Sequence, residues 1–131
     1  MQNLRLTGLY YHEGSGADKG NWCRWNFILS NGQESAIKND SVMVKHTLPD
    51  KPIRKVQMIV GNNSDYPSLQ GLKFFDEKNV LIYEIGKHDK SYLVKEVLLK
   101  EDERIVGFWS TKRLDGYAGH FDLQLMIATL N

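Results

Sequence analysis

Apolar and polar residues alternate with a period of two in several stretches of this chain. The longest such stretch is near the C-terminal end, where the alternate positions hold Phe121, Leu123, Leu125 and Ile127. Successive side chains of a β-strand point to opposite faces of a sheet. The pattern therefore predicts a strand whose large apolar residues face a core.

The same alternation recurs in the middle of the chain. It predicts three further strands with inward-facing residues, in chain order Val56, Met58 and Val60, then Leu72 and Phe74, then Leu81, Tyr83 and Ile85. Residues 93–98 also fit helical spacing. A strand is favoured there because the segment is short and is soon followed by residues 105–109, which have the pattern of another strand with one face inward.

Turn-forming residues separate these runs. Ser30-Asn31-Gly32-Gln33 predicts a hairpin turn, because Asn-Gly adopts positive φ at little cost. Residues 61–65, 76–79 and 86–91 predict further turns or loops, and Pro49 and Pro52 mark a break before a strand that begins near Ile53. We therefore expect an all-β chain: one β-prism-like or β-sandwich domain of antiparallel strands over residues 1–131.

Composition narrows the possible functions. Seventeen Lys and Arg residues against 16 Asp and Glu give a formal net charge of +1, which argues against nucleic-acid binding. No apolar run is long enough for a membrane-spanning helix, so no membrane insertion is expected. The absence of a signal-peptide pattern and the single cysteine, Cys23, favour a cytoplasmic protein without a disulfide. A domain cut from a larger protein would show the same features.

No catalytic or metal-binding signature stands out. The four histidines have no i, i+4 pairing and Cys23 has no Cys-x-x-Cys partner, so neither a zinc site nor a thiol nucleophile is indicated. Gly-x-Ser-x-Gly and P-loop motifs are absent, and residues 76–79 fit a turn better than a calcium loop. We expect a protein that is not an enzyme and needs no cofactor or metal.

Aromatic residues gather around two glycine-rich segments. Tyr10, Tyr11, Trp22 and Trp25 flank residues 14–20, while Trp109 and Phe121 flank residues 111–120, which contain Tyr117. A sugar site combines an aromatic platform, a carboxylate that accepts hydroxyl protons, and exposed backbone N–H groups. Tyr117, Asp122 and the backbone of Gly116 and Gly119 supply these groups in the second segment. The alternative is that Trp109 and Phe121 belong to the core and Gly116 forms an ordinary hairpin.

Several of these stretches resemble jacalin-related lectins. Residues 103–108, Glu-Arg-Ile-Val-Gly-Phe, are followed by residues 118–125, Ala-Gly-His-Phe-Asp-Leu-Gln-Leu, and residues 8–16 resemble the glycine-rich opening of that family. The resemblance implies a β-prism with a sugar site at Gly14, Gly119, His120, Phe121 and Asp122. The family's loop has Gly-x-x-x-Asp, whereas Gly119 and Asp122 are separated by two residues. The C-terminal run could instead match an internal strand of the family.

The first hypothesis is therefore a lectin-like module that binds carbohydrate through its glycine- and aromatic-rich loops. Its ligand-binding residues would be Gly14, Trp109, Tyr117, Gly119, His120, Phe121 and Asp122. The alternative is a structural or protein–protein interaction domain of a larger protein or assembly, with no small-molecule ligand.

Overall fold

A computed structural model describes residues 4–12, 24–34, 44–61, 68–86, 93–112 and 120–129. These ranges contain strands and no helix, which confirms the expected all-β fold. The strands are β1 (Leu6–His12), β2 (Arg24–Leu29), β3 (Val44–Thr47), β4 (Lys55–Gly61), β5 (Ser68–Phe75), β6 (Leu81–Gly86), β7 (Leu93–Leu98), β8 (Glu103–Lys112) and β9 (His120–Thr129).

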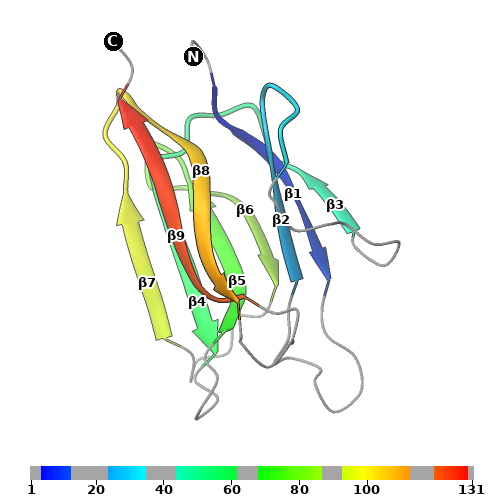
Figure 1. The fold of residues 1–131 in the computed structure, drawn as a ribbon. Coiled ribbons are helices and arrows are strands. Elements are labelled where there is room, and N and C mark those ends of the chain that lie inside the picture. Colours follow the sequence, from blue (N-terminus) through cyan, green and yellow to red (C-terminus); the bar gives the residue numbers. More distant parts are fainter. Residues whose placement is uncertain are drawn as a thin grey trace.

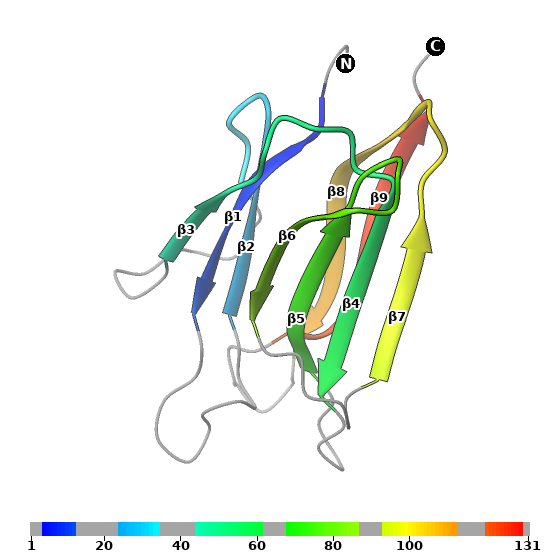
Figure 2. The same cartoon turned by 180° about the vertical axis from the view of Figure 1, so that it is seen from behind.

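The strands form three antiparallel sheets (Figure 1), with the orders β2-β1-β3, β6-β5-β4-β7 and β8-β9. Figures 1 and 2 show the β8–β9 pair lying over one face of the four-stranded sheet, with the three-stranded sheet beside it. Strand β9 contacts β5, while β8 contacts β1 and β2. The third sheet therefore bridges the other two.

All three sheets contribute to one hydrophobic core. Strands β4 and β5 bury Val56, Met58, Leu72 and Phe74, as the alternation predicts. The prediction was wrong for Val60, because the ladder shifts between Ile59 and Val60 and it is Ile59 that is buried. The three-stranded sheet contributes further buried residues to the same cluster, namely Leu6, Leu9, Trp25, Phe27 and Leu29. Burial of apolar surface from three sheets in one cluster is the main stabilising contribution to this arrangement.

Polar contacts also join the sheets. The Trp25 Nε1–H of β2 donates to the carbonyl oxygen of Leu69 in β5 at 3.0 Å. At another junction, Nδ1 of His46 in β3 lies 2.6 Å from the Tyr83 hydroxyl of β6. Partial burial lowers the pKa of His46, which favours its neutral form. Neutral imidazole can either donate to or accept from the tyrosine hydroxyl.

One register shift corrects the expected pattern of β6. Tyr83 pairs with Phe74, but Leu81 pairs with Phe75 because the ladder shifts between these positions. Leu81 is consequently 42% exposed, and Ile82 packs against the core instead. The prediction that Leu81 shares the inner face with Tyr83 and Ile85 was wrong, since strict alternation assumes an unbroken register.

Residues 93–98 form strand β7, not a helix. β7 pairs antiparallel with β4 along its whole length, from Leu93 opposite Val60 to Leu98 opposite Lys55. Its position at the edge of the sheet leaves most of its side chains exposed. Val97 is the exception, because it lies opposite the buried Val56 and packs against the core.

The turns predicted at residues 30–33 and 76–79 are both present, while residues 62–65 and 87–91 of the other two predicted turns lie outside the described residues. Gly32 has a φ of 86°, and the Leu29 N–H donates to the Gln33 carbonyl oxygen across the turn that follows β2. Between β5 and β6, Oδ1 of Asp76 accepts from the backbone N–H groups of Lys78 and Val80. The bond from Val80 is the main reason that the pKa of Asp76 is lowered. This carboxylate therefore stabilises a turn, as expected.

The register of β9 gives a direct test of which face is inward. Leu125 packs against the core, whereas the neighbouring Met126 is 54% exposed. Leu125→Ala should lower the free energy of unfolding by about 2 kcal/mol, the low end for a truncated core leucine. Met126→Ala should change it by less than about 0.5 kcal/mol. Urea denaturation of both variants measures the difference, and equal effects would contradict this register.

Candidate functional site

The strand ends that flank the two glycine-rich segments lie at one end of the molecule. The first segment connects β1 to β2, whose ends meet in the pair His12–Arg24. The second connects β8 to β9, whose ends meet in the pair Lys112–His120. In both views, β1 and β8 run toward the same end (Figures 1 and 2). Residues 13–23 and 113–119 themselves lie outside the described ranges.

The expected ligand-binding residues fall partly within the described strands. Trp109 lies in β8 opposite Gln124, while His120, Phe121 and Asp122 open β9. Asp122 pairs with Thr111, one register position from the end of the ladder. The structure describes the backbone of these four residues but not their side chains. Gly14, Tyr117 and Gly119 lie outside the described residues.

A pocket of about 440 Å³ lies at the opposite end, where β1 and β8 begin. Its walls come from the start of β1, the connection between β3 and β4, Leu99 and the start of β8. The lining residues are Arg5, Leu6, Thr7, Thr47, Leu48, Pro49, Asp50, Lys51, Pro52, Ile53, Leu99, Arg104 and Ile105. This volume falls within the range of ligand-binding pockets in proteins.

Backbone hydrogen bonds fix the walls of this pocket. The Leu48 N–H donates to the Thr7 carbonyl oxygen at 3.0 Å, which extends the pairing of β3 with β1. The chain then leaves the sheet at Pro49 and Pro52, which have no N–H to continue a ladder. It enters the four-stranded sheet at Arg54, whose carbonyl oxygen accepts from the Leu99 N–H at 2.8 Å. The pocket therefore lies against the connection that carries the chain from the three-stranded sheet to the four-stranded sheet.

The pocket has an apolar floor. The side chains of Leu6, Leu48, Leu99 and Ile105 are all buried members of the core cluster. Ile53 packs against that cluster and adds a further apolar wall. A ligand that entered here would therefore contact hydrocarbon at its inner end.

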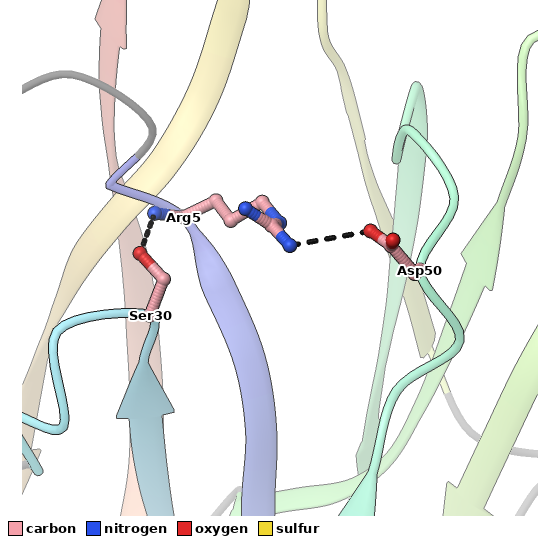
Figure 3. Close-up of polar contacts among 3 residues, drawn as sticks. All are labelled: Arg5, Ser30 and Asp50. Carbon is pink, nitrogen blue, oxygen red and sulfur yellow. Dashed lines mark hydrogen bonds and ion pairs between the residues drawn. The ribbon is translucent and has the colours of Figure 1, made fainter.

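Charged groups stand at the rim. Nη2 of Arg5 lies 3.2 Å from Oδ1 of Asp50, and the Arg5 backbone N–H donates to Oγ of Ser30 at 3.1 Å (Figure 3). The Arg5 and Asp50 side chains are 43% and 92% exposed, so water weakens the attraction between them. Arg104 and Lys51 add two more positive charges to the lining. Asp50 is the one carboxylate among the lining residues.

Arg104 is positioned by the turn that precedes β8. Its Nη1 donates to the carbonyl oxygens of Glu101 and Glu103, each at 2.8 Å. The Glu103 carboxylate in turn accepts from the Lys100 N–H at 2.6 Å. These bonds hold the guanidinium of Arg104 beside the pocket, and no side-chain carboxylate among the described residues forms an ion pair with it. Its positive charge is therefore available to a ligand.

Within the ranges that the structure describes, no three His, Cys, Asp or Glu side chains gather as a metal ion would require. The same ranges contain no helix long and apolar enough to cross a membrane. Comparison with protein-family models and with curated proteins finds no match to this chain.

Sequence patterns do not show this pocket. They mark the break at Pro49 and Pro52, but Arg5, Asp50 and Arg104 are far apart along the chain. These residues come together only through the pairing of β1 with β3 and the contact of β1 with β8. The local signal is Arg104, which directly precedes the strand predicted at residues 105–109. An arginine at such a position is too common to indicate a site.

Proposed function

We propose that this protein is a non-enzymatic binding module that recognises carbohydrate through residues 13–23, residues 113–119 and their flanking strand ends. The supporting observation is that β1 and β8 end on the same side of the molecule (Figures 1 and 2). Two loops far apart in sequence can then contact one ligand. Binding sites are commonly built from such loops on a rigid β scaffold.

The chemistry assigned to this end follows from the residue types. Asp122 accepts hydrogen bonds from sugar hydroxyls, and backbone N–H groups near Gly119 and His120 donate to them. Tyr117 or Trp109 stacks on the apolar face of the sugar ring. The resemblance to jacalin-related lectins supports the same assignment, with Gly14 contributing from the first segment and Phe121 from the second.

Asp122→Asn tests this function because it keeps the size of the side chain and removes its charge. A hydrogen bond to a charged group contributes about 1.5–3 kcal/mol, so the affinity for the sugar should fall about tenfold or more. Thermal stability should change little. A glycan array identifies the ligand, and titration calorimetry then compares the variant with the wild type.

Asp50→Asn is the matched control, since it is the same substitution at the other end of the molecule. It should leave glycan affinity unchanged. If Asp122→Asn lowers stability while affinity stays intact, Asp122 is a turn residue and not a sugar ligand. If the folded wild-type protein binds no glycan on the array, the carbohydrate proposal is rejected.

The second candidate function is a protein-interaction domain. The observation that favours it is strand β7, where Leu93, Val94 and Leu98 are all more than half exposed at a sheet edge. Exposed apolar side chains on an edge strand are typical of surfaces that bind another chain. A negative glycan screen on folded protein would favour this function over the first.

A further inference from the structure

We propose that the pocket between β1, the β3–β4 connection and the start of β8 binds a small organic anion with an apolar body and one carboxylate. This site lies at the end opposite the proposed sugar site. It is independent of that function, because it shares none of the residues assigned to carbohydrate.

The apolar body is required by the floor of the pocket. Leu6, Leu48, Leu99 and Ile105 are buried core residues whose outer atoms line it. A fully hydrated ion such as inorganic phosphate would lose water there without gaining hydrogen bonds. A hydrocarbon chain or ring instead removes this apolar surface from water, which is favourable.

The negative charge is required by the rim. Arg5, Lys51 and Arg104 line the pocket together with only one acidic side chain, Asp50. Arginine suits a carboxylate because its planar guanidinium can donate two parallel hydrogen bonds to both oxygens. A ligand whose apolar body lies on the floor would place its carboxylate among these cations.

Asp50 occupies the position that we assign to the ligand's carboxylate. One Asp50 oxygen lies 3.2 Å from one Arg5 nitrogen, and the Asp50 side chain is almost fully exposed (Figure 3). An ion pair of this kind contributes little stability, so an incoming carboxylate can displace it at low cost. In the free protein, Asp50 therefore competes with the ligand for Arg5.

Because of this competition, substitutions of the two partners of the Arg5–Asp50 ion pair should have opposite effects on ligand affinity. Arg5→Gln should weaken binding about tenfold, because it removes a charged donor to the ligand. Asp50→Asn should strengthen binding severalfold, because it frees Arg5 and removes a negative charge from the rim. Both substitutions break the same ion pair, so damage to the pocket alone would weaken binding in both variants.

The experiment is a titration of the full chain with octanoate, octan-1-ol or inorganic phosphate. Backbone amide NMR shifts measure binding at each step of the titration. Octanoate should shift the backbone amides of residues 5–7 and 104–105 and of the non-proline residues in 47–53, and it should bind at least about tenfold more tightly than the alcohol. Phosphate should shift them weakly or not at all. Lys95→Gln, which removes one positive charge from β7 outside the lining, should leave octanoate affinity unchanged.

Three results would overturn the proposal. The first is octanol binding as tightly as octanoate, which would show a hydrophobic pocket without charge recognition. The second is that Arg5→Gln and Asp50→Asn change the affinity in the same direction. The third is that octanoate causes no shifts in folded wild-type protein. The glycan affinity of Arg5→Gln should equal that of the wild type. The anion proposal and the carbohydrate proposal can therefore be rejected independently of each other.

Discussion

Trp25→Ala is expected to lower the free energy of unfolding by about 3–5 kcal/mol, the usual cost of truncating a buried tryptophan. The Trp25 side chain is 0% exposed, and its ring centroid lies 4.6 Å from that of Tyr11. Its Nε1–H also ties β2 to β5 through the Leu69 carbonyl oxygen. Domains of this size are stable by about 5–15 kcal/mol in total. The variant should therefore unfold at a much lower urea concentration than the wild type.

Trp25→Phe separates packing from the hydrogen bond. Phenylalanine keeps most of the apolar volume but has no donor for the Leu69 carbonyl oxygen. Leaving a buried acceptor without this donor costs about 1–3 kcal/mol, so the stability of this variant should lie between those of the wild type and Trp25→Ala. Urea denaturation of the three proteins measures the order. A midpoint for Trp25→Ala close to that of the wild type would contradict the position of Trp25 in the core.

Trp25 shows how sequence context can mislead. Its position grouped it with the aromatic residues around the first glycine-rich segment, yet it is a core residue. The evidence for burial was also in the sequence, because Trp25, Phe27 and Leu29 alternate with other residues, and all three are buried. Period-two alternation is a statement about packing, whereas an aromatic near glycines is compatible with either role.

Local sequence patterns predicted most of the strands. The exposure of individual side chains and the position of the pocket depend instead on long-range strand pairing. The alternation in β4, β5 and β9 and the turns at residues 30–33 and 76–79 follow from neighbouring residues. The exposure of Leu81 does not, because it results from a shift in the ladder between β5 and β6. The pocket at Arg5 and Arg104 likewise depends on which strands lie side by side, and local patterns do not encode that.

Two glycines with positive φ allow strain and steric clash to be distinguished. Gly32, in the turn after β2, and Gly86, at the end of β6, have φ values of 86° and 89°. A Cβ on Gly32 would meet nothing within 4 Å. A Cβ on Gly86 would collide with the carbonyl oxygen of Gln70 and lie 2.8 Å from the Cα of Gly71. Both contacts are with the backbone of β5, which cannot rotate away as a side chain could.

Gly86→Ala should therefore destabilise the protein far more than Gly32→Ala. At Gly32 the cost is the strain of an L-residue with positive φ, about 1–2 kcal/mol. At Gly86 the same strain is joined by displacement of β6 from β5, because Gly86 pairs directly with Gly71. We expect a total loss of about 3 kcal/mol or more there. Thermal and urea denaturation of both variants give the comparison. Equal losses would mean that β6 does not approach β5 closely at Gly86, and the register of that edge would have to be redrawn.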